Sequence, residues 1–214
     1  MKTYEELVAE ALALPLDGRD PSQLDGRLIE SSPPWSYQDR ADELVRRADG
    51  PILDMSAGDT DLGPGGADAL PFPDDRYAVV LNRHDRYKPL EVARVLRADG
   101  VFLTEQIGGL DGLAINEALG GPLPDGDPDW SLSSARADLE AAGLRVAGGR
   151  TTFPERLFHD IGALIYFLRK VPRQVPDFSI EGYDGQLRAL HEQMSAGEPF
   201  RDRAVRFLIE AVHP

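Results

Sequence analysis

Two histidines of the sequence lie in polar segments and could accept or donate a proton in a reaction. His84 belongs to the segment NRHDRY, which begins at Asn82 and follows the apolar run Tyr77–Leu81. His159 stands beside Asp160 in the segment PERLFHDIG. Because imidazole titrates near neutral pH, each histidine is a candidate general base or polar substrate contact. A solvent-facing or helix-capping histidine fits both patterns as well, and the sequence leaves this alternative open.

A third group of polar residues follows the short apolar run at residues 52–55, which contains Asp54. Ser56 and Gly58 come next and open a segment rich in Gly, Asp and Pro. Many nucleotide sites begin with a strand that enters a glycine-containing turn after an acidic residue, because glycine lets backbone N–H groups approach the ligand. A plain turn after a strand is the alternative. Glu105 and Gln106 end a later apolar run, where they would face either a ligand or solvent.

The pattern of apolar residues predicts which helices and strands position these residues. Apolar residues at helical spacing predict helices, and short apolar runs bounded by Gly and Pro predict strands. We expect helices over residues 3–14, 35–48, 89–98, 110–119, 132–142, 154–172 and 179–194, and strands over 52–55, 77–81, 101–107, 144–152 and 204–212. This alternation predicts an α/β fold with helices on both faces of a mostly parallel sheet.

Length and composition limit the classes of protein that fit. With 214 residues, 42% of them hydrophobic, the chain is long enough for one domain, which we predict over 1–214 with a helical cap at 1–48 and an α/β core at 49–214. The absence of cysteine excludes disulfides and thiolate chemistry. Asp125, Asp127 and Asp129 resemble a calcium loop, but Trp130 and Arg136 stand where glycine and glutamate are needed, so we expect no metal.

The net charge of -14 opposes binding to nucleic acid or to an anionic membrane, since both need a basic face. No apolar run approaches the roughly 20 residues needed to cross a bilayer. The first residues, MKTYEELVAEALALPL, carry acidic groups within their apolar pattern, unlike a signal peptide. We therefore expect a cytoplasmic protein whose partner is a small molecule.

Three segments together resemble the class I S-adenosylmethionine-dependent methyltransferases: LDMSAGD at 53–59, DALPFPDDRYAVVLNRH at 68–84 and EVARVLRADGVFLTEQIG at 91–108. The resemblance is clear over residues 40–110 and looser elsewhere. It implies a Rossmann-like sheet and S-adenosylmethionine as cofactor, with Asp54, Ser56 and Gly58 at the methionine end. The adenine-contacting acid of the family falls near Gly66 or Asp68, and Asn82 follows the family's fourth strand at its ligand-facing end.

The sequence departs from the family in two respects. The family loop is usually D/E-x-G-x-G-x-G, whereas Asp54, Ser56, Gly58 and Thr60 keep only one of its three glycines. Residues 57–76, rich in Gly and Pro, must also replace the family's second and third strands and their helices. The carboxylate that holds the ribose hydroxyls therefore has no counterpart. The family order predicts a sheet in which the strands rank first, fourth, fifth, seventh and sixth.

Loss of two strands would leave strand 52–55 at an edge of the sheet. Because an unpaired edge promotes aggregation, we expect the N-terminal helices, the 57–76 loop or a second subunit to cover it, the last giving a homodimer.

Two functional hypotheses follow from the resemblance. The first is an active methyltransferase on a small molecule, with His84 or His159 as base where the acceptor must lose a proton. The second is a methyltransferase-like protein that no longer binds the cofactor and acts as a binding, regulatory or partner subunit. Two lost ribose hydrogen bonds, each worth roughly 1.5–3 kcal/mol, would weaken binding by about two to four powers of ten. A nicotinamide-dependent enzyme fits less well, since it needs the same acid and a fuller glycine loop.

Overall fold

The computed structural model describes residues 2–16, 24, 26–56 and 69–214. Its contacts divide the chain into two units. The five-stranded unit comprises Pro33–Gly108, Asp129–Thr152 and Arg206–Pro214, and the three-stranded unit comprises Met1–Ser32, Gly109–Pro128 and Phe153–Val205. Each unit is described by itself. The single domain expected over 1–214, with its cap at 1–48 and core at 49–214, stays a prediction.

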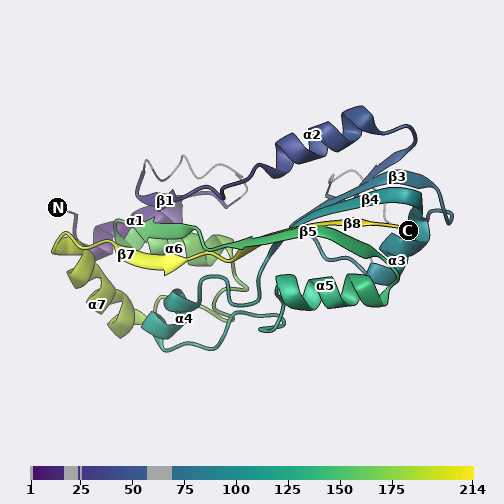
Figure 1. The fold of residues 1–214 in the computed structure, drawn as a ribbon. Helices are drawn as coiled ribbons and strands as arrows, with labels where there is room; N and C mark the ends of the chain where they lie inside the picture. Colours follow the sequence, from purple (N-terminus) through teal and green to yellow (C-terminus); the bar gives the residue numbers. More distant parts are fainter. Residues whose placement is uncertain (1, 17–23, 25, 57–68) are drawn as a thin grey trace. The chain divides into compact units, whose positions relative to one another are not determined.

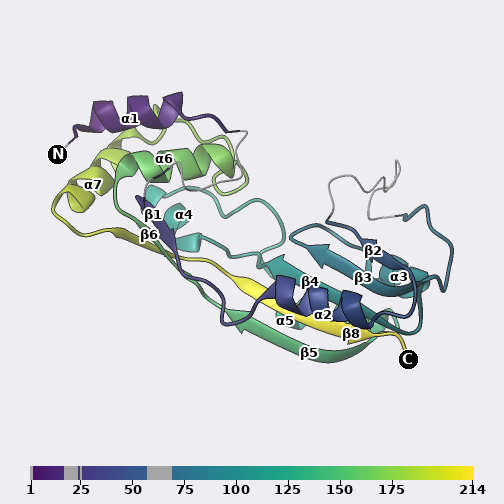
Figure 2. The ribbon, with the colours of Figure 1, turned by 90° about the horizontal axis from the view of Figure 1, so that it is seen from above.

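The sheet of the five-stranded unit has the order β2-β3-β4-β8-β5 (Figure 2). Its strands are β2 (Ile52–Asp54), β3 (Tyr77–Arg83), β4 (Leu96–Ile107), β8 (Arg206–Val212) and β5 (Arg145–Thr152). Strands β2, β3 and β4 run parallel, and β8 lies antiparallel between β4 and β5. This order confirms the sequence prediction of first, fourth, fifth, seventh and sixth strands.

Helices cover both faces of this sheet, as predicted (Figure 1). On one face, α2 (Tyr37–Arg47) buries Tyr37, Ala41 and Leu44 against β3 and β4. These positions are four and three residues apart, so they form one stripe of the helix. On the other face lie α3 (Pro89–Val95) and α5 (Leu132–Ala141), whose buried residues join Val80 and Phe102 in a second core.

Among the described residues, β2 pairs only with β3 and therefore forms an edge of the sheet. Ile52 on this edge keeps 38% of its surface exposed. The predicted absence of the family's second and third strands agrees with this arrangement. Gly58 and Asp68, like most of the predicted 57–76 loop, lie outside the described residues. The cover for the edge, including the proposed homodimer contact, stays a prediction.

The three-stranded unit contains an antiparallel sheet of order β1-β6-β7 that the sequence did not predict. Its elements are β1 (Leu28–Glu30), β6 (Glu155–Phe158), β7 (Phe200–Arg203), α1 (Tyr4–Ala13), α4 (Leu113–Leu119), α6 (Ile161–Lys170) and α7 (Asp184–Ser195). Helices α1 and α6 lie side by side in both views (Figures 1 and 2). The apolar faces of these helices, with Phe158 and Phe200, form the core.

The predicted helix over 154–172 is wrong in its first part. Residues 155–158 form strand β6, and α6 begins at Ile161. Asp160 has extended backbone angles and accepts a hydrogen bond from the N–H of Ala163 at 3.0 Å, so it is the N-cap of α6. Pairing of β6 with β1 and β7 outweighs the helical spacing of its apolar residues. Of the described helices, none is long and apolar enough to cross a membrane.

Candidate functional site

The carboxyl ends of three parallel strands bring most of the predicted site residues together. In the register of the sheet, Asp54 of β2 pairs with Leu81 of β3, and Asn82 pairs with Thr104 of β4. Parallel strands end at the same edge of a sheet, which is where ligands bind in open α/β folds. His84 follows β3 directly, and its backbone N–H donates to the carbonyl oxygen of Glu105 at 2.8 Å.

On the face of the sheet covered by α2, Glu105 is a buried carboxylate that several donors surround. Only 3% of its surface is exposed. Its carboxylate accepts hydrogen bonds from Trp35 Nε1 at 3.0 Å and Arg83 Nε at 3.1 Å, and His84 Nε2 lies 3.1 Å from Oε1. Burial alone would raise the pKa of Glu105, but the hydrogen bonds from His84 and Trp35 and the charge of Arg83 outweigh burial and lower it to about 2. Glu105 is therefore an anion at neutral pH.

The ionised carboxylate favours one tautomer of the neutral His84 ring. An acceptor at 3.1 Å favours the tautomer with hydrogen on Nε2, which leaves the Nδ1 lone pair of the neutral ring as a proton acceptor. His84 has a φ of +62°, a left-handed conformation that costs a non-glycine residue energy. The backbone and Glu105 together fix the ring, as a general base requires.

Asn82 lies on the opposite face, because successive strand residues point to opposite sides. It is fully buried, with 0% of its surface exposed. Its Oδ1 accepts from Thr104 Oγ1 at 3.1 Å and from Gln106 Nε2 at 2.7 Å. Among the described residues, Nδ2 has no hydrogen-bond partner. An unsatisfied buried donor costs about 1–3 kcal/mol, so this amide offers a hydrogen bond to any acceptor that reaches it.

Asp54 and Ser56 form the turn after β2. The exposed Asp54 accepts a hydrogen bond from the backbone N–H of Ser56 at 2.9 Å. The oxygens Ser56 Oγ and Tyr37 Oη are both buried. Burial, followed by the negative charge of Asp54, raises the pKa of the Tyr37 hydroxyl, which therefore stays protonated. The Arg83 guanidinium lies 5.4 Å from the centre of the Tyr37 ring.

These groups fit one part of S-adenosylmethionine better than another. Asn82 Nδ2 and Ser56 Oγ offer donors, and Asp54 offers an acceptor, which suits the charged amino-acid end of such a cofactor. The ribose hydroxyls need a carboxylate after a strand beside β2. No such strand exists in the described ranges.

Of the predicted site residues, the structure places Asp54, Ser56, Asn82 and His84 at the carboxyl ends of the parallel strands in the five-stranded unit. Gly58 and Asp68 lie outside the described residues. His159 belongs to the three-stranded unit. The hydrogen bonds of Trp35 and Arg83 to Glu105 were not foreseen. In the sequence each of these residues is only a polar or aromatic side chain beside an apolar run. Solvent-facing residues show the same pattern, so it does not single them out.

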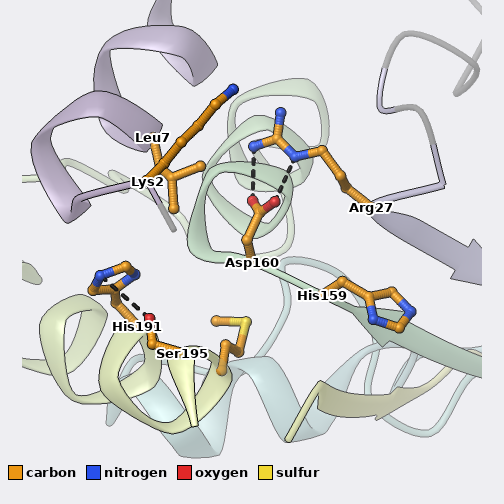
Figure 3. Close-up of a pocket in the computed structure, with 8 residues that line it drawn as sticks. Lys2, Leu7, Arg27, His159, Asp160, His191 and Ser195 are labelled. Carbon is orange, nitrogen blue, oxygen red and sulfur yellow. Dashed lines mark hydrogen bonds and ion pairs between the residues drawn. The ribbon is translucent and has the colours of Figure 1, made fainter. Parts of the chain in front are cut away.

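His159 lines a pocket of about 350 Å³ in the three-stranded unit (Figure 3). The residues around it come from the start of α1, the segment before β1, the turn between β6 and α6, and the last turns of α7: Lys2, Leu7, Arg27, His159, Asp160, His191, Met194 and Ser195. Arg27 binds Asp160 with two parallel hydrogen bonds of 2.5 and 2.7 Å. His159 itself remains exposed, and no described cluster of acidic or histidine residues could hold a metal.

Comparison with known proteins finds similarity in structure only. No family model matches the chain, and no curated protein matches it. A candidate methyltransferase from Bacillus halodurans, BH2331, has a TM-score of 0.46 and 17% identity over 69% of each chain. A candidate methyltransferase complexed with the Haloferax volcanii activator Trm112 has a TM-score of 0.42 and 16% identity over 100% of each chain.

A geranyl diphosphate methyltransferase in complex with S-adenosylmethionine has a TM-score of 0.37 and 13% identity, over 82% of this chain and 85% of that one.

Proposed function

We propose that the strand ends of the five-stranded unit bind S-adenosylmethionine and that the chain transfers its methyl group to a small molecule. The observation that supports the proposal is the buried Asn82, whose Nδ2 lacks a partner in the described chain. It lies at the carboxyl end of β3, one residue beyond the partner of Asp54 in β2. Asn82 and Asp54 thus supply a donor and an acceptor from opposite faces of the sheet, at the strand ends where α/β sheets bind ligands.

The cofactor would supply an activated methyl group on a positively charged sulfur. The chain would contribute placement, because in-line displacement depends more on proximity and orientation than on acid–base groups. Asp54 would accept from the ammonium group, and Asn82 Nδ2 and Ser56 Oγ would donate to oxygen or nitrogen acceptors.

A proton has to be removed only if the molecule that accepts the methyl group does so through a hydroxyl or an ammonium group. His84 would accept that proton on Nδ1 while its Nε2–H stays bonded to Glu105. His159 remains a second candidate, since the sequence interpretation applies to it equally.

A second candidate function is supported by the exposed edge at β2. The described sheet supplies no carboxylate for the ribose, so a methyltransferase-like protein without cofactor, acting as a binding or regulatory subunit, fits the same structure. The two functions differ in one measurable property, affinity for the cofactor.

Calorimetric titration of the purified protein with S-adenosylmethionine and S-adenosylhomocysteine distinguishes them. The proposal expects a dissociation constant on the order of micromolar. Asp54→Asn should weaken binding of both ligands about tenfold, because a charged hydrogen bond contributes roughly 1.5–3 kcal/mol and Asp54 is exposed.

Asp42→Asn is the matched control. Asp42 is an exposed aspartate of α2 that accepts a hydrogen bond from Gln38 at 2.8 Å, so the substitution changes the charge equally without touching the strand ends. Equal loss of affinity in the two variants would indicate a general charge effect. No heat with either ligand at millimolar concentration would leave the subunit function as the better proposal.

A further inference from the structure

The pocket of the three-stranded unit combines an apolar floor with a polar rim. Leu7 of α1 and Met194 of α7 are buried and contribute its apolar surface. Around them stand Lys2, Arg27 and the two histidines, while His191 and Ser195 approach each other from the last turns of α7 (Figure 3). The volume of about 350 Å³ lies near the lower limit for pockets that bind small molecules.

One wall of the pocket is fixed by the pair of Arg27 and Asp160. The pair is bidentate, and Asp160 also caps α6 through the N–H of Ala163. Burial raises the pKa of Asp160, but the hydrogen bond from Arg27 and the helix N–H groups outweigh it and lower the pKa overall. A Cβ atom at Gly162 would lie 2.9 Å from the backbone oxygen of Leu7 as well as 2.5 Å from Arg27 Nη2, so the close approach of α6 to α1 requires glycine.

Basic side chains outnumber acidic ones in the lining of the pocket although the whole chain is acidic, and Glu10, beside Lys2 and Arg27, offsets part of this charge. The whole sequence has 37 acidic residues against 23 Lys and Arg. Of the pocket's lining residues, four are basic (Lys2, Arg27, His159 and His191) and only Asp160 is acidic. Its carboxylate is engaged by Arg27 and the start of α6, so it is already neutralised.

Lys2 is the most adaptable donor at the rim. Its ammonium pairs with Glu10 at 2.5 Å and is more than half exposed. Glu10 also lies 3.5 Å from Arg27. An ammonium group has three N–H donors, so Lys2 can bind Glu10 and a ligand at once. His191 Nε2 lies 3.5 Å from Ser195 Oγ, and its ring packs on Tyr4 with centroids 5.8 Å apart, which holds it at the pocket.

We infer that this pocket binds a small organic anion. The carboxylate or phosphate group of the ligand would contact Lys2 and the imidazole of His191, and its apolar body would cover Leu7 and Met194, with His159 elsewhere in the lining of the same pocket. Charge-assisted hydrogen bonds provide the specificity for an oxyanion, and burial of the apolar body adds affinity. The inference does not require methyl transfer, since every residue that carries it belongs to the three-stranded unit and only His159 is also a candidate proton acceptor.

The four histidines of the chain allow a direct test by proton NMR. Benzoate and phenyl phosphate serve as anionic probes, and benzyl alcohol serves as a neutral probe of similar shape. Assignment uses the variants His159→Gln and His191→Gln. We expect saturable shifts of the His159 and His191 ring protons with an anionic probe, at a dissociation constant on the order of 1 mM or tighter. His84 and His213 should stay unchanged.

Lys2→Gln should weaken binding of the better anionic probe about five- to tenfold. Lys170→Gln is its matched control: Lys170 lies in the same unit over the Tyr166 ring, outside the pocket, and the variant has the same net charge. Saturation by one anion and not the other would identify the head group as carboxylate or phosphate.

Three results would overturn the inference. They are the absence of any saturable shift with both anions, equal binding of benzyl alcohol, and equal weakening by Lys2→Gln and Lys170→Gln.

Discussion

Two buried carboxyl groups, one in each unit, respond to burial in opposite ways. Glu105 in the five-stranded unit is 3% exposed and Asp202 in the three-stranded unit is 1% exposed. The pKa of Glu105 falls to about 2, whereas burial raises the pKa of Asp202 to about 6 against the opposing charge of Arg156. Burial is similar, so the partners of each group decide the direction.

Glu105 has three donors to itself: Trp35, Arg83 and His84. Asp202 must share its side-chain donor, the guanidinium of Arg156, with other carboxylates. Across the sheet, Glu30, Arg156 and Asp202 are paired in register, and Arg156 also lies 3.6 Å from Asp111. One guanidinium thus serves three carboxylates, and Asp202 Oδ1 has no hydrogen-bond partner in the described chain.

The contrast separates a stabilising carboxylate from a costly one. Glu105 favours the folded state when ionised, and it lies among the polar residues at the strand ends. Asp202 favours the folded state when protonated, because its negative charge is incompletely compensated. The two groups should therefore give opposite signs when each carboxylate is replaced by its amide.

The largest expected effect is that of Glu105→Gln. A lowered pKa contributes stability above the unfolded value near 4.5, and that stability is lost as the pH falls toward 2. The substitution should reduce the free energy of unfolding by about 3 kcal/mol at pH 7. Urea unfolding at pH 7, 5 and 4 should show the difference from wild type narrowing below pH 4.5.

Glu140→Gln is the control for that measurement, since Glu140 is half-exposed and pairs with Arg136 of the same helix at 2.9 Å. It should cost at most about 0.5 kcal/mol. If Glu105→Gln changed stability as little as the control, the three donors would not stabilise the carboxylate.

Asp202→Asn should act in the other direction. A raised pKa means that stability is fully present below the unfolded value near 3.8 and is lost as the pH rises through about 6. An asparagine carries no charge and can still accept from Arg156 through Oδ1. We expect a gain of about 1 kcal/mol above pH 7 that disappears near pH 4.

The measurement is urea unfolding of wild type and variant at pH 4, 5, 6 and 7.5. A variant that is less stable than wild type by the same amount at all four values would show that the ion pair with Arg156 outweighs the cost of burying Asp202.

The same two regions show what the sequence could and could not predict. Strand order in the five-stranded unit was predictable, because β2, β3 and β4 are apolar runs bounded by Gly, Pro and polar residues, and their resemblance to a known family supplied the order. The rule that ligand sites lie at strand ends also predicted that Asp54, Asn82 and His84 are candidate site residues.

The three-stranded unit was not predictable in this way. Its strands read LIE, ERLF and FRDR, so Arg156 and Asp202 look like solvent-facing residues although both are buried. Their burial depends on pairing between segments about 45 and 125 residues apart, which no local pattern shows. The helical spacing of residues 154–172 gave the wrong element at 155–158 for the same reason.

The smallest expected effect tests how far the low pKa of Glu105 depends on a single donor. The hydrogen bond from His84 is the largest single interaction that lowers the pKa of that carboxyl, while Arg83 acts on it through both its charge and a hydrogen bond. His84→Leu should therefore raise the pKa of Glu105, while costing only about 0.5–1.5 kcal/mol of stability, the net value of one hydrogen bond. Carboxyl ¹³C NMR of the protein across pH 2–6 measures the shift directly.

His213→Leu, at the end of the same unit, is the control and should leave the titration of Glu105 unchanged. An unchanged pKa in His84→Leu would mean that Trp35 and Arg83 suffice to hold the carboxylate. Glu105 would then stabilise the sheet edge without orienting His84, and the assignment of His84 as the proton acceptor would lose its structural support.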